Sequence, residues 1–405
     1  MDLAKLRKDF PTLREEDAPA YLDNACVTLK PDSVVSTIHD YYSKTPGCGG
    51  RSVHRYGSKI SQATEQARSK LQNFIGAETQ KEIVFTRNAT HSLNQVAHGL
   101  SWEKGDIVLT TDREHNSNLV PWLQLEQEQQ IDHRVVASNP DNSFDIEAFE
   151  IACADAGSKL KLVSMSHVGN LDGVHIPIKE IGKIAHDYGA LICVDGAQST
   201  PHMDVNVKEL DIDFLAFSIH KMCGPSGMGG LWGRYDLLDG LRTIQSGGQT
   251  VQSSTYDSID WAKPPARFEG GLGNFSGMMA TGAAIEYLSK IDMNAVQEHE
   301  IRLNTIMTDG IKDLPGIEII GPLDARKRGG ICSILMGDIP VHDIALLLDE
   351  AAGVMVRSGQ HCVHSWFHNR GHHNGSLRAS AYLYNTEEEA RLFAETFSEA
   401  VHAFS

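Results

Sequence analysis

Short apolar, β-rich runs alternate with helical patterns from residue 60 to residue 240. Strands that alternate with helices are joined by crossover connections, so this pattern predicts an α/β fold around a mainly parallel, seven-stranded sheet. In such sheets, ligands bind beyond the carboxyl ends of the strands. The predicted strands are EIVFT (82–86), DIVLTT (106–111), HRVVAS (133–138), KLVSMSH (161–167), LICVDGA (191–197), FLAFSIH (214–220) and GGLWGRY (229–235).

The pattern changes after residue 240. The stretch 244–274 is polar and rich in turn residues, and a loop of this length is usually functional or part of an interface. We expect a large domain over 21–290 and a smaller α+β domain over 291–405, with residues 1–20 packing against the smaller one. After the polar stretch, the sequence predicts helices at 277–290, 295–313, near 341–351 and from about 386, and short strands at 316–320 and 330–337.

Charge and cysteine usage narrow the function classes. The 405 residues carry a formal net charge of −17, which argues against a general nucleic-acid binder or a protein of anionic membranes. The first residues lack the layout of a signal peptide, and no apolar run approaches transmembrane length. The seven cysteines are scattered and include no CxxC pair, so neither a disulfide framework nor a zinc ribbon is predicted, and we expect a cytoplasmic protein.

Reactive side chains follow several of the predicted strands. Lys221 ends the run FLAFSIHK, and Asp195 ends LICVD one crossover earlier in the chain. Asn170 and His115 follow two other strands, and a Thr-His-Ser turn at residues 90–92 opens a helix whose N-terminus suits a phosphate. Taken alone, Lys221 is an ordinary solvated lysine and Asp195 an ordinary helix cap. Together, an amine, a carboxylate, an imidazole and a phosphate site are what a pyridoxal phosphate pocket requires.

The sequence resembles the class V, fold-type I pyridoxal phosphate enzymes, and within them the SUF-system (group II) cysteine desulfurases. The resemblance runs nearly from end to end, and its His-Lys and Arg-Ser-Gly-Gln-His-Cys segments are highly specific. It implies a homodimer that feeds sulfur to an acceptor protein or scaffold of iron–sulfur cluster assembly. The segments that carry it are YLDNACVTLKP (21–31), SVHRYGSKISQATEQAR (52–68), REHNSNLVPW (113–122), SHVGNLDG (166–173), VDGAQSTPH (194–202), FSIHKMCGPSGMGGLWG (217–233), RFEGG (267–271), VRSGQHCVH (356–364) and LRASAYLYNT (377–386).

Roles for individual residues follow from this resemblance. It implies that Lys221 forms the Schiff base with the cofactor, that Asp195 holds the pyridine nitrogen and that His115 stacks on the ring. Substrate cysteine would displace Lys221, whose amine then moves the α-proton, and Cys362 would take the sulfur as a thiolate, leaving alanine and a persulfide. The remaining implied contacts are Gln198 near the phenolic oxygen, Thr90, His91, Ser218 and His220 on the phosphate, and Asn170, Arg378 and Arg357 on the substrate.

The cysteines are expected to differ in reactivity. Cys362 lies in the segment RSGQHCVHSWFHNRGHH, which is too polar for a core and favours a reactive loop cysteine. Cys193 and Cys332 lie inside apolar strands and are expected to be inert. Cys223, two residues after Lys221, is expected to be a small apolar filler.

The chain also departs from the family pattern. Leu272 and Gly273 stand in GGLGNFSG where the family usually has a threonine and a proline that reach the partner subunit's cofactor phosphate. We expect that contact to be lost, or replaced by Ser276 or a backbone N–H group. The proline that commonly follows the nucleophile is also missing, since Val363, His364 and Ser365 come directly after it.

Three other functions remain as alternatives. A selenocysteine lyase or related lyase could use the same pocket, and turnover of cysteine and selenocysteine with and without Cys362 would separate the two. A metal-binding module is suggested by the histidines near Cys362, although their spacing fits no regular four-ligand pattern, so no metal is expected. A silent cofactor-binding scaffold is disfavoured by the complete set of reactive residues. The histidines in question are His361, His364, His368, His372 and His373.

Overall fold

The computed structural model describes residues 2–15 and 17–404. Its centre is a seven-stranded sheet in the order β2-β8-β7-β6-β5-β3-β4, and all seven strands predicted from the sequence are found in it. Strand β8 is antiparallel to both neighbours, whereas the other pairs are parallel. The strands are β2 (Ile83–Thr86), β3 (Ile107–Thr111), β4 (Asp132–Val136), β5 (Leu160–Ser166), β6 (Leu191–Asp195), β7 (Phe214–Ser218) and β8 (Gly229–Gly233).

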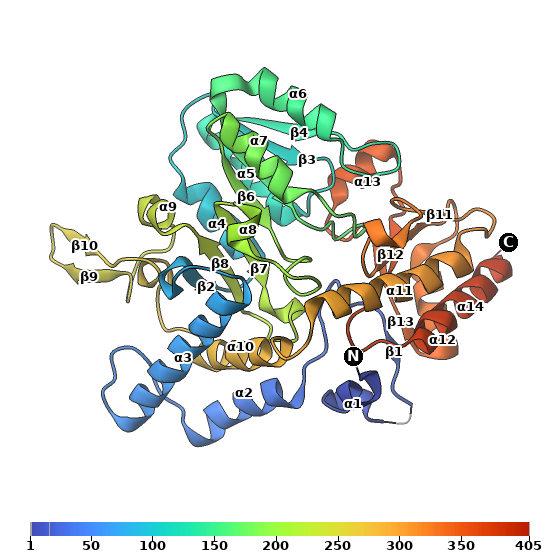
Figure 1. Cartoon of the computed structure of the whole chain (residues 1–405), viewed down its shortest axis with the longest axis horizontal. Helices are drawn as coiled ribbons and strands as arrows, with labels where there is room; N and C mark the ends of the chain where they lie inside the picture. The colour runs from blue at the N-terminus through green and yellow to red at the C-terminus, as the bar shows by residue number, and fades with distance from the viewer. Residues whose placement is uncertain (1, 16, 405) are drawn as a thin grey trace.

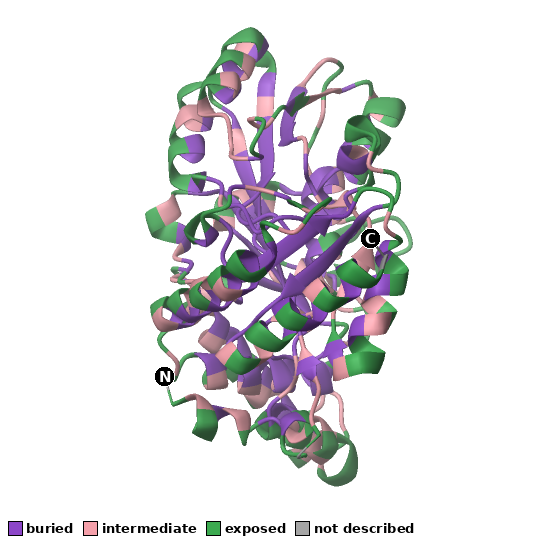
Figure 2. Cartoon of the chain, turned by 90° about the vertical axis from the view of Figure 1, so that its right-hand side faces the viewer, coloured by how far each residue is buried: buried purple, intermediate pink, exposed green. Residues whose placement is uncertain are grey.

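Helices cover both faces of this sheet, which is why its strands read as continuous apolar runs. Successive strand residues enter different cores: Leu109 packs on one face and Val108 on the other. Figure 2 shows the strands as a buried layer beneath helices whose outer faces are exposed. One face is covered by α3 (Arg55–Phe74), α6 (Ile146–Ala156), α7 (Ile178–Asp187) and α10 (Phe275–Leu288), and the other by α4 (Ala89–Gly99) and α5 (Val120–Gln129).

A second, antiparallel sheet of four strands has its own apolar core beside the first (Figure 1). Its order is β11-β12-β15-β14. The short strand β1 (Ala20–Tyr21) pairs in parallel with β13 (Val354–Met355) beside it, which brings the start of the chain to this part of the molecule. The remaining elements here are β11 (Glu318–Ile319), β12 (Ile331–Leu335), β14 (Arg357–Gly359), β15 (Ser376–Ser380), α11 (Met293–Ile311), α12 (Val341–Ala352), α13 (His364–Arg370) and α14 (Glu387–Phe404).

The prediction that residues 244–274 form one long loop is in part wrong. The segment contains an antiparallel hairpin of β9 (Val251–Ser254) and β10 (Ile259–Trp261). Both strands are polar or exposed, and the pattern therefore gave no apolar signal for them. Across the described residues, no helix combines the length and apolar character needed to cross a membrane. The other helices are α1 (Leu3–Arg7), α2 (Asp32–Lys44), α8 (Val207–Leu210) and α9 (Tyr235–Gly240).

Candidate active site

A cavity lies where the carboxyl ends of the central strands face the second sheet. Its walls come from segments far apart in the sequence, including Ala25–Cys26, the first turn of α4, and the loop before α13. Every predicted site residue except His91 lines it. His91 instead faces a neighbouring depression, and its Nδ1 accepts a hydrogen bond from the Arg87 backbone N–H at 3.3 Å. The predicted residues that line the cavity are Thr90, His115, Asn170, Asp195, Gln198, Ser218, His220, Lys221, Arg357, Cys362 and Arg378.

Lys221 and Asp195 lie at the ends of neighbouring parallel strands. Lys221 closes the single turn Ile219–Lys221 directly after β7, and Asp195 is the last residue of β6. Burial lowers the pKa of the Lys221 amine to about 8, against the opposing effect of the Asp195 carboxylate. Burial also raises the pKa of Asp195, while a hydrogen bond from the Ala197 N–H and the charge of Lys221 act to lower it. The amine is thereby brought close to neutrality, the state in which it is a nucleophile.

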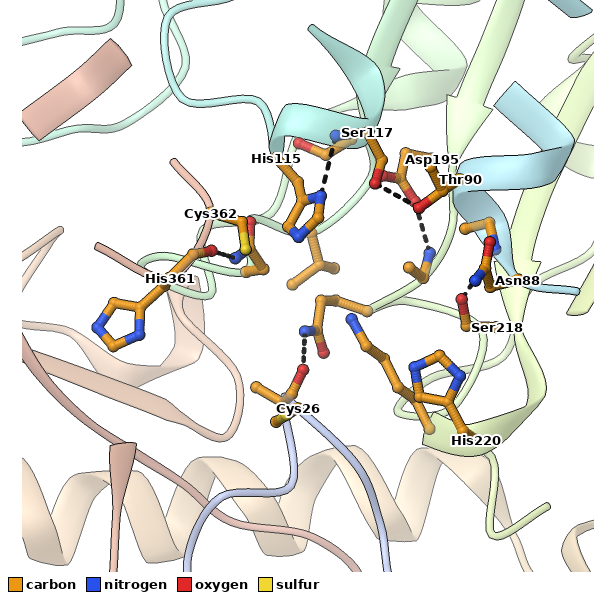
Figure 3. A pocket seen from close by; sticks show the side chains of 18 of the residues that line it. Cys26, Asn88, Thr90, His115, Ser117, Asp195, Ser218, His220, His361 and Cys362 are labelled. Atoms are coloured by element: carbon orange, nitrogen blue, oxygen red, sulfur yellow. Dashed lines mark hydrogen bonds between the residues drawn. The ribbon is translucent and has the colours of Figure 1, made fainter. Parts of the chain in front are cut away.

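His115 borders the cavity at the end of β3. Its Nδ1 accepts a hydrogen bond from the Ser117 backbone N–H at 3.0 Å (Figure 3), so the proton of the neutral ring belongs on Nε2. Burial, followed by the charges of Lys221 and Arg378, lowers the pKa of His115 to about 3. The ring is therefore neutral over the whole physiological range and can lie against an aromatic ligand without adding charge.

The N-terminus of α4 forms another wall. Asn88 caps this helix by accepting from the His91 N–H at 3.0 Å. The Ala89 N–H donates to Ser218 Oγ at 2.9 Å, and the Thr90 hydroxyl bonds to Ser117 Oγ at 2.6 Å. The dipole of α4 and the hydroxyls of Thr90, Ser117 and Ser218 together make this end of the cavity suitable for an anion such as phosphate.

One buried polar atom here lacks a partner. Gln198 is 2% exposed; its Nε2 donates to the Ala25 carbonyl at 2.9 Å, yet its Oε1 makes no hydrogen bond within the described residues. A buried amide oxygen without a partner costs free energy, so a ligand donor is expected at this position. Pyridoxal phosphate fits the set: an aldehyde for the Lys221 amine, a pyridine nitrogen for Asp195, a phenolic oxygen near Gln198 and a phosphate for α4.

Cys362 is half-buried at the cavity, on a turn with unusual backbone angles. His361 has φ of +48° and Cys362 has φ of +60°, a left-handed conformation that costs energy in residues with a Cβ. Two hydrogen bonds hold it: the Asn116 N–H donates to the Cys362 carbonyl at 2.8 Å, and Asn170 Nδ2 donates to the His361 carbonyl at 2.8 Å. Asn170, predicted to receive the substrate carboxylate, thus binds the turn that carries the thiol.

Two arginines from the second sheet complete the site. Arg357 on β14 and Arg378 on β15 are direct cross-strand neighbours. Arg378 Nη1 donates to the Asn170 carbonyl at 2.8 Å and Nη2 lies 3.4 Å from Asp23 Oδ1, while Arg357 Nη1 lies 2.9 Å from Cys26 Sγ. Asp23 and Cys26 were not singled out in the sequence. Their signal was the segment 21–31, which the parallel bridge between Asp23 and Ser380 brings to the cavity.

A fully buried ion pair joins two loops of the site. Arg113, two residues before His115, contacts Asp172, two residues after Asn170, at 2.9 Å, and both side chains are completely buried. We expect Asp172→Ala to lower the free energy of unfolding by about 3–5 kcal/mol, because it leaves the guanidinium buried without a counter-charge. Chemical denaturation would measure this. Asp324→Ala, which removes an exposed pair with Arg326, is the control and should leave the midpoint nearly unchanged; an equal, small shift in both variants would contradict the prediction.

Among the histidines around Cys362, the rings of His368 and His373 lie 5.4 Å apart, but the others have separate partners. Asn116 Nδ2 donates to His364 Nδ1 at 2.8 Å, and His372 stacks on Trp366. His361 is buried against Ser376. Within residues 2–15 and 17–404, no three His, Cys, Asp or Glu side chains are grouped so that they could hold a metal ion. The geometry therefore gives no support to the metal-binding alternative.

The segment GGLGNFSG, which differs from the family pattern at Leu272 and Gly273, does not line this cavity. Leu272 is 77% exposed, and the Ser276 hydroxyl, buried, bonds to Asn274 Oδ1 at 3.0 Å and to the Tyr42 hydroxyl at 3.2 Å. Ser276, considered above as a substitute for the missing threonine, is therefore already hydrogen-bonded within its own chain.

Comparison with known proteins assigns the family. Residues 20–393 match the model for class V aminotransferases. A protein of Halalkalibacterium halodurans named probable cysteine desulfurase is 36% identical over 98% of this chain and 97% of its own length, and a cysteine desulfurase of Haloferax volcanii is 35% identical over 100% and 98%. The apo structure of a cysteine desulfurase from Thermococcus onnurineus superposes with a TM-score of 0.93 at 36% identity, covering 99% of this chain and 98% of that one. The chain belongs to the class V aminotransferase family, within the fold-type I enzymes that depend on pyridoxal phosphate.

Proposed function

We propose that this protein is a cysteine desulfurase, which removes the sulfur of L-cysteine to give L-alanine and a persulfide on Cys362. The observation that carries the proposal is that the Cys362 thiol borders the same cavity as Lys221 and Asp195, on a turn hydrogen-bonded to the wall that holds His115. Relatives at 34–37% identity that match almost over their whole length bear the names cysteine desulfurase or probable cysteine desulfurase.

Bound pyridoxal phosphate would supply an electron sink that reaches the substrate through its amino nitrogen. Asp195 would hold a proton on the ring nitrogen of the cofactor, and Lys221 would provide the amine that anchors its aldehyde. Once free, Lys221 Nζ removes and returns protons at the substrate carbon, a task for which a pKa of about 8 is well matched. The His115 ring would lie against the aromatic ligand. Because the ring is neutral, the positive charge of the cavity wall comes from Arg357 and Arg378.

Arg378 is placed to bind the substrate carboxylate. Burial lowers the pKa of its guanidinium, although the nearby Asp23 carboxylate opposes this, and its Nε is buried without a partner among the described residues. A carboxylate ligand would satisfy that donor in the paired geometry that arginine favours. Arg357, its cross-strand neighbour, adds a second positive charge at the same end of the cavity.

Cys362 performs the sulfur transfer. Its thiolate attacks the substrate Sγ; the new S–S bond forms as the substrate Cβ–Sγ bond breaks, and the electron pair stays with the substrate carbon, where protonation yields alanine. The left-handed turn fixes the direction of the thiol, and its position between buried and exposed suits a group that must reach both the cavity and an outside acceptor.

The pKa of Lys221 predicts how apo-protein takes up its cofactor. Below pH 8 the amine is mostly protonated and lacks the lone pair that attacks an aldehyde, so we expect the rate of pyridoxal phosphate incorporation to rise about tenfold per pH unit up to pH 8 and then to level off. The growth of cofactor absorbance in stopped-flow mixing would measure it, with far-UV circular dichroism as the control for folding. A rate that keeps rising until pH 10 would contradict a buried amine.

The finer proposal concerns partners. We propose a cytoplasmic homodimer that passes the Cys362 persulfide to an acceptor protein or scaffold of a SUF-type iron–sulfur assembly system. Its support is the exposed apolar side chains on the β9–β10 hairpin and nearby loop, namely Tyr256, Ile259 and Leu272, and seven cysteines without a disulfide among the described residues.

The desulfurase activity is tested by incubation with L-cysteine and a mild reductant, with alanine and sulfide measured together. Equal amounts of the two products are expected, and sulfide without alanine would refute the proposed activity.

A further inference from the structure

The cavity is bordered by two cysteines, Cys362 and Cys26. They lie 336 positions apart in the chain, but both belong to the walls shown in Figure 3. The function proposed above uses only one of these thiols.

The position of Cys26 is fixed by its neighbours. The Ala25 N–H donates to Ser380 Oγ at 2.9 Å, and the Ala25 carbonyl accepts from Gln198 Nε2 at 2.9 Å. These bonds tie the segment to both sheets of the protein. Cys26 is half-buried, so its sulfur is held at the cavity wall without being sealed in a core.

Positive charge faces the sulfur of Cys26. Arg357 Nη1 donates to Cys26 Sγ at 2.9 Å, which makes the sulfur a hydrogen-bond acceptor and places a positive charge beside it. Arg378 is only 2% exposed, and its buried Nε has no partner among the described residues. That donor is the one assigned above to the substrate carboxylate, so Arg357 is the cation that neighbours Cys26.

The other five cysteines lack these properties. Burial raises the pKa of Cys153 and of Cys223 to about 12, and it raises the pKa of Cys193 and Cys332 as well. This agrees with the expectation that Cys193, Cys223 and Cys332 are inert. Cys48 is half-buried like Cys26, but it does not line the cavity and its thiol donates to the Gly49 carbonyl.

We propose that Cys26 is a second sulfur-accepting thiol of this pocket, which receives the outer sulfur of the Cys362 persulfide. The proposal rests on the proposed function. In the transfer, the Cys26 thiolate attacks the outer sulfur; the S–S bond at Cys362 breaks as one forms at Cys26, and Cys362 leaves as a thiolate. One S–S bond replaces another, so no oxidant or reductant is consumed.

The transfer would let each chain hold two sulfurs when no acceptor is present. The outer sulfur of a persulfide extends about 2 Å beyond Sγ, and Cys362 and Cys26 line the same cavity. Once it has moved to Cys26, the Cys362 thiolate is free for a second substrate. The charge of Arg357 would hold the stored persulfide as an anion.

The test uses holoenzyme mixed with excess L-cysteine, without reductant or acceptor. We expect a burst of about two alanines per chain, falling to about one in Cys26→Ser and staying at about two in the matched control Cys48→Ser. Alkylation, digestion and mass spectrometry should find one added sulfur on the Cys26 peptide of the wild type and none on it in Cys362→Ala. The wild-type peptide map decides the matter even if the Cys26 variant fails to fold.

Two results would overturn the transfer while leaving the proposed function standing. In the first, sulfur is found on Cys362 but never on Cys26. In the second, Cys26 still gains sulfur in Cys362→Ala, which would mean that it takes sulfur from the substrate directly. Failure of the proposed function looks different, because the wild type would then form no alanine and carry no added sulfur on either cysteine.

Discussion

Replacing Lys221 with alanine should abolish cysteine turnover, with a loss of about a thousand-fold or more, because it removes the amine that both anchors the aldehyde and moves the substrate proton. Lys221 stands at the end of β7 with its amine enclosed by the cavity and its pKa lowered to about 8. Borohydride treatment of wild-type holoenzyme, followed by peptide mapping, should place the reduced cofactor on Lys221, and the variant should yield no such adduct.

Lys30 provides the matched control for this prediction. Burial also lowers its pKa to about 8, but its amine donates to the His220 carbonyl at 2.9 Å and does not line the cavity. Lys30→Met should therefore still trap the cofactor on Lys221. A trapped adduct on Lys30, or on any lysine of the Lys221→Ala protein, would refute the assignment of Lys221.

Replacing Cys362 with alanine should leave the cofactor colour intact and reduce sulfide and persulfide formation from cysteine by about a hundred-fold or more. The reason is that Cys362 contributes only the sulfur nucleophile, whereas cofactor-binding groups such as Asp195 and Lys221 come from other walls of the cavity. Cofactor absorbance and sulfide release measure the two effects separately.

Cys48→Ala serves as the control for thiol removal, since Cys48 lies away from the cavity; it should retain full sulfide formation. Full desulfuration by Cys362→Ala would show that the nucleophile lies elsewhere. If that variant keeps its turnover of selenocysteine while losing that of cysteine, the pocket can support selenium elimination without the thiol, as the lyase alternative requires.

The central sheet was predictable because strands buried on both faces consist largely of apolar residues, a pattern that can be read from the sequence. Six of its seven strands are buried along almost all their length, whereas the edge strand β4 (DHRVV) is mostly not buried and shows its apolar pair only at the end. The positions of Asp195 and Lys221 followed from the same pattern, since residues at the ends of adjacent parallel strands must meet at one edge. Helices α11, α12 and α14 were also found, because each has one apolar face. The short helix α13 (His364–Arg370) lies in the histidine-rich segment that was predicted to be a loop, and was missed.

The strands that carry the arginines gave no such signal. β14 and β15 contain Arg357 and Arg378 among short, polar residues. Likewise, the hairpin β9–β10 is exposed and has no apolar alternation to reveal it. The periodicity of apolar residues shows which side chains are buried in a core. It does not reveal strands that form because of the strands they pair with rather than because of their own composition.

The sequence by itself determined the sheet, the order of its reactive strand ends and, through the specific segments around Lys221 and Cys362, the family to which the chain belongs. Only the tertiary structure decided that Asn170 binds the Cys362 turn, that His91 faces away from the cavity and that Cys26 lies against Arg357. His91 is bonded to nearby Arg87, whereas the Asn170 and Cys26 contacts join residues far apart in the chain. Such contacts depend on how two independently packed sheets meet, which no local pattern of residues records.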